Sequence, residues 1–304
     1  MELFVMDIED LRKFLAITES NNLQIASSKL NITAGALSKS IKRLEIKLNC
    51  QLFDRLGRNI FLNRNGEKFI QYALNLVHES DQAISEFVGN NRIQNINISG
   101  PAVLMQHWLP LIINQLNEPL YKFNIIVDWE GNSVSSLSTN KAHLALVTDR
   151  AESTNESEFT SFNLGTTQFK VVASKNHPIY FNYDQSKGIT SNDLSKFAFA
   201  CPTVSPFCGI KRGIGSDGWN DLTVPRTIKY HCNDFSVLTS LVQQGHALAY
   251  MPDFVASDNN FEVININDCH LTCNEKIIIL YKPSQATGWL NNLIYKFSHY
   301  LKEN

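Results

Sequence analysis

The stretch LQIASSKLNITAGALSKSIKRLEIKL, residues 23–48, decides the fold because its pattern is that of two short helices broken by a tight turn. Apolar side chains recur at helical spacing in its first half, and Asn31 then interrupts the pattern with a residue that tolerates left-handed backbone geometry. Thr33 can cap the second helix, along which one stripe of apolar residues recurs: Leu37, Ile41, Leu44 and Leu48. The stretch therefore predicts a helix-turn-helix.

The outer face of the predicted second helix suits contact with DNA. Small residues stand at its leading end, where an approaching surface comes close, and cations follow: Thr33, Ala34, Gly35, Ser38, Lys39, Lys42 and Arg43. In a helix laid in the major groove, the first residues reach base edges and the cations reach phosphates. An ordinary amphipathic helix with a solvated basic face is the alternative that this helix alone leaves open.

The charge around this stretch favours the DNA-binding interpretation. Residues 29–68 hold nine Lys or Arg against three Asp or Glu, in a chain of 304 residues whose net charge is only −2. A basic segment within a nearly neutral chain is the electrostatic footprint expected of a protein that binds a polyanion.

A β-wing is predicted directly after the two helices. Two short apolar segments, residues 52–53 and 60–62, flank a turn that contains Gly57 and the cations Arg55 and Arg58. A hairpin with basic residues at its tip can contact the DNA backbone beside the groove that holds the helix. A hairpin that only stabilises the domain, with solvated arginines, is the alternative.

A long helix is predicted from about residue 66 to residue 88, capped by Asn63 or Asn65. Its apolar residues recur at intervals of three and four: Phe69, Ile70, Ala73, Leu74, Val77, Ile84 and Phe87. Such a helix would extend roughly 35 Å, farther than a small winged domain can cover, so we expect it to pack against the same helix of a second chain. Packing against the chain's own second domain is the alternative. Residues 89–91, Gly-Asn-Asn, are predicted to form a hinge after this helix.

From residue 92 onward, strand and helix patterns alternate. The expected strands cover residues 96–98, 123–127, 144–147, 169–173, 197–200, 227–231, 247–251, 262–266 and 276–281, with helices after residue 101 and at about 233–244 and 285–301. A βαβ pattern of this kind predicts a largely parallel sheet, here in two similar α/β lobes. The expected domains are residues 1–65, 66–91 and 92–304, with lobe I at about 92–165 and 266–304 and lobe II at about 166–265.

A small-ligand site is expected between the two lobes. In such domains ligands bind at the carboxyl ends of strands, where helix N-termini expose N–H groups that suit anions. The matching positions are Ser99, Gly100, Pro101, Ala102, Thr148, Thr203 and Asn233. No cluster of Arg or Lys stands at these points, so a neutral ligand and an empty cleft stay open, and each residue could also serve only as a cap or turn.

The order of these parts resembles the LysR-type transcriptional regulators over nearly the whole chain. The residues that carry the resemblance are FLAITESNNLQIASSKLNITAGALSKSIKRLEIKLNCQLFDR (14–55), LNRNGEKF (62–69) and VQQGHALAYMP (242–252). Where this family commonly has Gln-Pro at the head of the recognition helix, this chain has Ala34-Gly35. This difference removes a side chain that could hydrogen-bond a base. We therefore do not assume that this chain's operator is the interrupted palindromic DNA sequence that is usual for the family.

The resemblance implies a sequence-specific DNA-binding transcriptional regulator and not an enzyme. Its fold class would be α+β multidomain: an N-terminal winged helix-turn-helix, a long linker helix and a two-lobed α/β effector domain like periplasmic binding proteins. The implied partners are double-stranded DNA, a small-molecule effector such as an anion, and RNA polymerase. The implied assembly is a homodimer through the linker helix and a homotetramer, with no cofactor. An effector that prefers one lobe arrangement would change the spacing of the DNA-binding heads.

Two rival functions are weighed against this one. The first is a regulator switched by thiol oxidation at Cys201 and Cys208, where nearby Lys211 and Arg212 could lower a thiol pKa. The second is an α/β enzyme or binding protein, although the chain has no Gly-x-Ser-x-Gly elbow, phosphate loop, dinucleotide fingerprint or His-Glu-x-x-His motif. No catalytic residue is therefore expected, and the C-x-x-x-C pair Cys269 and Cys273 falls short of a closed metal site.

The sequence predicts a cytoplasmic location. Residues 1–14 lack the basic and apolar regions of a secretory signal, and the longest uncharged run, residues 93–117, is rich in polar residues. We therefore expect no membrane span and six free cysteine thiols.

Overall fold

The computed structural model of the chain divides into two compact units, which are described separately. The first comprises Met1–Ile93 with Thr139–Lys141, and the second comprises Gln94–Ser138 with Ala142–Asn304. The structure describes residues 6–20, 22–56, 59–88, 94–116, 119, 121–152, 158–182, 188–268, 273–283 and 288–303.

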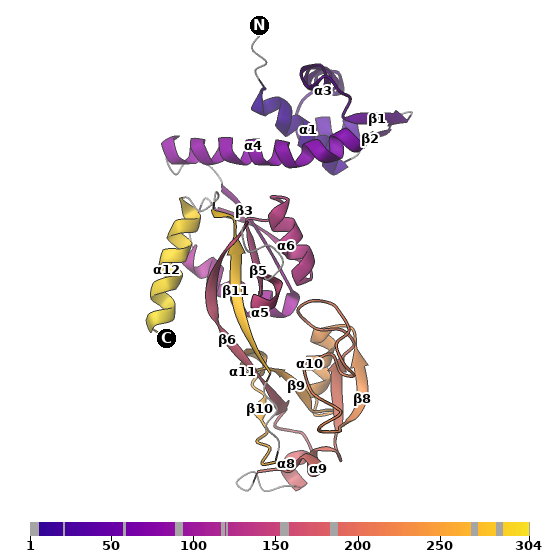
Figure 1. Cartoon of the computed structure of the whole chain (residues 1–304), viewed down its shortest axis with the longest axis vertical. Coiled ribbons are helices and arrows are strands. Elements are labelled where there is room, and N and C mark those ends of the chain that lie inside the picture. The colour runs from indigo at the N-terminus through magenta and orange to yellow at the C-terminus, as the bar shows by residue number, and fades with distance from the viewer. Residues whose placement is uncertain are drawn as a thin grey trace. The chain divides into compact units, whose positions relative to one another are not determined.

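The first unit is a winged helix-turn-helix followed by a long helix (Figure 1). Its elements are α1 Ile8–Ser20, α2 Leu23–Lys29, α3 Ala34–Leu48, β1 Phe53–Leu56, β2 Asn59–Leu62 and α4 Arg64–Val88. Asn31 adopts a left-handed φ of 54° after α2, and the Thr33 hydroxyl accepts a hydrogen bond from the Ala36 amide at 3.1 Å. Both predictions about the turn are confirmed, and Asn63 is the residue that caps α4, through the amides of Asn65 and Gly66.

One apolar core holds these elements together. Leu37, Ile41 and Leu44 of α3 are buried in it, and the Phe14 ring of α1 contacts the rings of Phe53 and Phe69 at centroid distances of 5.4 and 5.3 Å. The long helix approaches the wing closely at Gly66, where a Cβ atom would lie 2.1 Å from the Leu52 carbonyl oxygen. A glycine is therefore needed at this crossing.

The first half of the apolar stripe predicted on α4 packs within the first unit. Phe69 and Ala73 are buried in its core, and Ile70 and Val77 pack against it. Two large apolar side chains on another face of α4 stay exposed, Tyr72 at 66% and Leu76 at 38%. The Phe87 side chain lies outside the described residues. The pairing of α4 with a second copy therefore stays a prediction, and Tyr72 and Leu76 add exposed apolar surface beside the predicted stripe.

The second unit is an α/β domain. Its strands are β3 Gln94–Gly100, β4 Tyr121–Val127, β5 Leu144–Thr148, β6 Thr160–Ala173, β7 Ala198–Pro202, β8 Thr227–Cys232, β9 Ala249–Pro252, β10 Glu262–Val263 and β11 Asn274–Tyr281. Its helices are α5 Ala102–Gln115, α6 Glu130–Ser138, α7 Asp149–Glu152, α8 Ile179–Asn182, α9 Ser191–Leu194, α10 Phe235–Gln243, α11 Asp253–Asp258 and α12 Trp289–Glu303.

The prediction of a largely parallel sheet is wrong in part. Pairing is parallel for β3 with β4 and β5, and for β7 with β8. It is antiparallel for β11 with β5 and β6, and for β9 and β10 with β6. The reason is that β6 and β11 run along both lobes in opposite directions (Figure 1). The expected lobe division at residues 165/166 falls inside β6, beside a register shift opposite Ile277 and Ile278.

Lobe I, built on β3, β4 and β5, has helices on both faces of its sheet. Leu144 and Leu146 of β5 belong to the core formed with α5 and α12, whereas Ala145 and Val147 face a second core that includes Val134 and Leu137 of α6. Figure 1 shows α6 and α12 on opposite sides of the strands. Burial on both faces explains the uninterrupted apolar run of β5.

In lobe II, built on β7 to β10, an irregular loop at residues 203–226 connects the parallel strands β7 and β8. The Arg226 side chain, which is 0% exposed, pairs with Asp217 and Asp221 at 2.8 Å each. Its guanidinium also lies 5.0 Å from the centre of the Trp219 ring. One buried cation therefore ties three points of the loop together.

We predict that Arg226→Met lowers the free energy of unfolding of the second unit by about 3–5 kcal/mol, because it leaves two buried carboxylates without their counter-ion. The four tryptophans all lie in this unit, so urea unfolding of the whole protein followed by tryptophan fluorescence reports on it. Lys122→Met, which removes an exposed cation of β4, is the control and should change stability by less than about 0.5 kcal/mol. Equal stability of the two variants would contradict the role given to Arg226.

Candidate nucleic-acid interface and lobe junction

One face of α3 is open to solvent. Gly35, Lys39, Lys42 and Ile46 recur at intervals of four, three and four and are all exposed, with Ile46 at 66%. Thr33 and Arg43 are also exposed, whereas Ala34 and Ser38 are half-buried. A Cβ atom at Gly35 would meet nothing within 4 Å, so a second surface can approach the backbone closely there. Helical spacing alone would have added Ile46 to this face, but the sequence reasoning missed it.

The two lysines of this face are available to a partner. Lys39 and Lys42 make no ion pair with any residue that the structure describes. Phosphate groups of a nucleic acid are the natural counter-ions for such exposed ammonium groups.

Arg43 is held differently from these lysines. Its guanidinium donates a hydrogen bond to Asp10 of α1 at 2.9 Å and another to the Ser40 hydroxyl at 3.3 Å. The Ser40 hydroxyl also donates to Asp10, and Lys13 lies 4.0 Å from the same carboxylate. The sequence predicted that Arg43 reaches phosphates. In the structure its hydrogen bonds connect α3 to α1.

The Asp10 carboxylate is the centre of this link and is only 1% exposed. Burial opposes its ionisation, but hydrogen bonds from Ser40 and Arg43, together with the positive charges of Arg43 and Lys13, outweigh burial and lower its pKa below 3.8. The ionised carboxylate therefore fixes how α3 lies on α1.

The backbone of the predicted wing is present. Strands β1 and β2 pair antiparallel, with Phe53 opposite Leu62 and Asp54 opposite Phe61. Arg58 lies outside the described residues, as does the side chain of Arg55, so their contact with DNA stays a prediction.

The ends of three strands and one loop meet where the lobes join. The Asp128 amide donates to the Gly100 carbonyl at 3.1 Å, and the Glu130 amide donates to the Phe207 carbonyl of lobe II at 3.2 Å. A Cβ atom at Gly209 would lie 2.5 Å from the Trp129 ring, so this ring packs directly on the Gly209 backbone. We call this region, residues 99–102, 128–130, 148–150 and 203–216, the lobe junction.

The predicted effector residues of lobe I are engaged within the fold. The Ser99 hydroxyl donates to the Ser133 hydroxyl at 2.9 Å, and the Thr148 amide donates to a Glu130 carboxylate oxygen at 2.7 Å. Pro101 precedes α5 without any side-chain cap, which leaves the first amides of that helix, beginning at exposed Ala102, free of an intrahelical partner.

The predicted residues of lobe II lie on neighbouring strand ends. The Thr203 amide donates to the Cys232 carbonyl at 2.9 Å, and the Thr203 carbonyl accepts from the Ser216 hydroxyl at 3.1 Å. The Thr203 hydroxyl has no hydrogen-bond partner among the described residues. Asn233 is exposed, and Asp234, not Asn233, caps α10 by accepting from the amides of Ser236 and Val237.

A charged cluster that the sequence did not indicate lies at the lobe junction. Arg150 contacts buried Glu275 of β11 at 2.8 Å, and Arg212 of the 203–226 loop interacts electrostatically with both Glu130 and Glu275. Burial raises the pKa of both carboxyl groups, and the Arg150 charge opposes this for Glu275. The expectation of no Arg or Lys cluster here is wrong, because Arg150, Arg212 and Glu275 come together only through the tertiary fold.

Cys201 lacks the features of a reactive thiol. Its side chain is 0% exposed and hydrogen-bonds to Asp217, and burial, followed by the Asp217 charge, raises the pKa of the thiol. Cys208 is half-buried. Cys50, Cys201, Cys208, Cys232 and Cys273 are free thiols as expected, and Cys269 lies outside the described residues.

Neither a metal-binding cluster nor a membrane-spanning helix occurs in the part of the chain that the structure describes. Among the described residues, no group of three or more His, Cys, Asp or Glu side chains could hold a metal ion. No described helix is both long enough and apolar enough to span a membrane.

Two family models match the chain in the order of its two units. Residues 8–67 match the bacterial regulatory helix-turn-helix protein, lysR family, and residues 91–288 match the LysR substrate binding domain. The chain therefore belongs to the LysR family.

Individual relatives agree with this assignment. The uncharacterized HTH-type transcriptional regulator YbhD of Escherichia coli (strain K12) is 26% identical over 178 residues. These residues are 57% of this chain and 55% of YbhD, so the chain matches about half of the length of that relative. ArgP from Mycobacterium tuberculosis has a TM-score of 0.65 at 17% identity, covering 97% of this chain and 98% of that one. Full-length CbnR in complex with its target DNA has a TM-score of 0.61 at 14% identity, covering 97% and 99%. At such identities the structures show a common fold alone.

We predict that Asp10→Asn lowers the free energy of unfolding of the first unit by about 2 kcal/mol at pH 7, because hydrogen bonds to a buried charged group are lost. Since the pKa of Asp10 is lowered in the folded protein, its contribution is complete above pH 3.8 and disappears as the pH falls through the folded value. Urea unfolding followed by far-ultraviolet circular dichroism at pH 7 and at pH 3 measures both effects. Glu9→Gln, at an exposed neighbouring position, is the control and should have the same free energy of unfolding as the parent protein. If Asp10→Asn also had the parent's free energy of unfolding at pH 7, the stabilising role given to the Asp10 contacts would be refuted.

Proposed function

We propose that this protein is a transcriptional regulator, not an enzyme, that binds double-stranded DNA through α3. The observation that carries the proposal is the exposed face of α3, with Gly35 at its leading end and unpaired Lys39 and Lys42 further along. The helix is long enough to lie in a major groove, with its first residues at base edges and its lysines at phosphates. The solved complex of CbnR with its target DNA has the same fold and supports this reading.

The proposed assembly is a homodimer through α4. Exposed Tyr72 and Leu76 lie one helical turn apart, and such an apolar pair on a 25-residue helix favours burial against a second copy. Two copies would supply two recognition helices for a two-fold DNA site. By family analogy, the proposal extends to a homotetramer that acts with RNA polymerase in the cytoplasm.

The proposed effector is a small anion, such as a carboxylate, bound at the lobe junction. Three features suit a negative group. They are the first amides of α5, the Thr203 hydroxyl, which has no hydrogen-bond partner among the described residues, and the exposed side chains of Arg212 and of Arg150, which also pairs with Glu275. Ser99, Gly100, Pro101 and Thr148 would form the wall behind it, with Asn233 beside it on lobe II. Binding would bias the lobe arrangement and so the placement of the DNA-binding heads.

We predict that Lys39→Ala and Lys42→Ala each weaken binding to every duplex and reduce the slope of log affinity against log salt by roughly one, as expected for one lost phosphate contact. Fluorescence anisotropy with duplexes selected from genomic fragments, at several salt concentrations, measures the slope. Lys122→Ala, at an exposed position of β4, is the matched control and should keep it. Unchanged slopes for both α3 variants would show that another surface binds DNA.

We predict that a carboxylate which stabilises the parent protein in a thermal-shift screen binds about tenfold more weakly, or worse, to Thr203→Val and to Arg212→Met. Each substitution removes one hydrogen bond to a charged group, which contributes about 1.5–3 kcal/mol. Titration calorimetry gives the affinities. Lys211→Met, next to Arg212 and equally exposed, is the control and should bind normally. If all three variants bound equally well, the anion site would lie elsewhere.

A further inference from the structure

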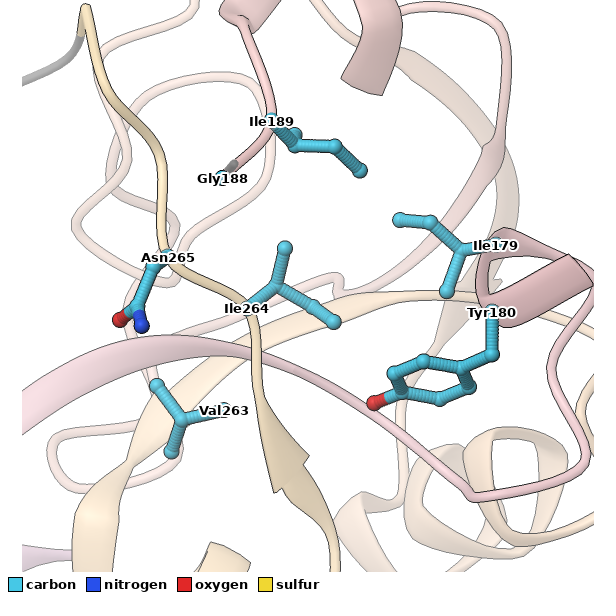
Figure 2. Close-up of a pocket in the computed structure, with 7 residues that line it drawn as sticks. All are labelled: Ile179, Tyr180, Gly188, Ile189, Val263, Ile264 and Asn265. Carbon is cyan, nitrogen blue, oxygen red and sulfur yellow. The ribbon is translucent and has the colours of Figure 1, made fainter. Parts of the chain in front are cut away.

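A small cavity with both apolar and polar walls lies in lobe II between α8 and the chain that follows β10. Its volume is about 100 Å³. Figure 2 shows Ile179, Ile189 and Ile264 lining it from three separate segments. These three side chains are 2%, 5% and 9% exposed, so the walls belong to the core. Figure 1 shows α8 and β10 at the end of the second unit opposite α6, so the cavity is distinct from the lobe junction.

Backbone hydrogen bonds fix the walls of the cavity. The Ile189 amide donates to the Asn265 carbonyl at 3.1 Å, and the Ile264 amide donates to the Val171 carbonyl of β6 at 2.8 Å. Gly188 adopts φ of +67°, and a Cβ atom there would lie 2.1 Å from the Asn267 side chain. Both walls are therefore attached to neighbouring backbone, one to the chain after β10 and the other to β6.

The α8 wall is fixed by a buried histidine. His177 is 2% exposed, and burial lowers its pKa to about 4, so its imidazole is neutral at physiological pH. The neutral ring accepts a hydrogen bond from the Ile179 amide at 3.2 Å. This contact orients the first turn of α8, from which both Ile179 and Tyr180 reach the cavity.

Beside Asn265, the cavity has a second polar lining group, the Tyr180 hydroxyl. It is shielded from solvent and has no hydrogen-bond partner among the described residues. Figure 2 shows it extending toward Val263 and Ile264. Burial, followed by the negative charge of Glu262, raises the pKa of Tyr180 to about 12, so the hydroxyl keeps its proton and can donate. A buried donor without an acceptor costs about 1–3 kcal/mol, which an entering acceptor would recover.

We propose that this cavity binds a small uncharged molecule whose apolar body approaches a benzene ring in size and whose single hydrogen-bond acceptor meets the Tyr180 hydroxyl. Apolar cavities of roughly 150 Å³ are known to stay dry and to take up benzene, so 100 Å³ with an open mouth at half-exposed Val263 suits a ligand of this class. Three buried isoleucines provide the apolar contact, and the tyrosine selects for the acceptor.

The test uses the full-length protein with phenol and toluene as probes, followed by ligand-observed NMR titration. The parent protein should bind both, and Tyr180→Phe should weaken phenol about tenfold, corresponding to 1.4 kcal/mol, while the affinity for toluene changes less than twofold. Tyr295→Phe, at a tyrosine that is 65% exposed on α12, should change neither affinity. Thr203→Val should also change neither, because the lobe junction is a different site.

A second variant closes the cavity without touching its core. Val263→Phe enlarges a side chain that is 45% exposed at the mouth, so the protein should fold normally by circular dichroism while both probes lose binding. The proposal is overturned if neither probe binds the parent protein, if Tyr180→Phe leaves the affinity for phenol unchanged, or if Val263→Phe binds both probes as the parent does.

Discussion

The interaction on which the proposed DNA-binding surface depends is the ionised Asp10 carboxylate buried between α1 and α3. A buried charge is tolerated only where partners compensate it, and here Ser40 and Arg43 of α3 do so, with Lys13 nearby. The apolar stripe of α3 alone would permit the helix to rotate slightly on the core, whereas these directional contacts fix its angle. The directions in which Lys39 and Lys42 point depend on that angle. One carboxylate on α1 therefore helps to set where the cations of the exposed α3 face lie.

The second unit depends on a different constraint, which is that β6 and β11 continue through both lobes. A pair of long antiparallel strands forms a stiff but bendable connection, and the register shift beside Gly165 marks where it can bend. The lobe junction is built from groups carried by both lobes, so the proposed effector would contact both of them. The buried Arg226 cluster holds the 203–226 loop that supplies one side of the junction.

The local parts of this structure were predictable from the sequence, whereas its long-range parts were not. Caps at Thr33 and Asn63 and the left-handed turn at Asn31 depend on neighbouring residues, so the winged helix-turn-helix followed from short patterns. The direction of the strands could not be predicted from short patterns, because β11 pairs with strands more than a hundred residues earlier in the chain. The link from Asp10 to Arg43, the Arg150–Glu275 contact at the lobe junction and the Tyr180 cavity likewise join distant residues. The exposed pair Tyr72 and Leu76 of α4 was missed because both residues lie outside the predicted stripe.

Lysine acetylation footprinting of the protein on a saturating duplex, read by mass spectrometry, shows whether α3 contacts DNA. If it does, Lys39 and Lys42 lose reactivity when DNA is bound, while exposed Lys122 and Lys211 of the second unit keep theirs. Full reactivity of both α3 lysines on DNA-saturated protein would contradict the proposed contact.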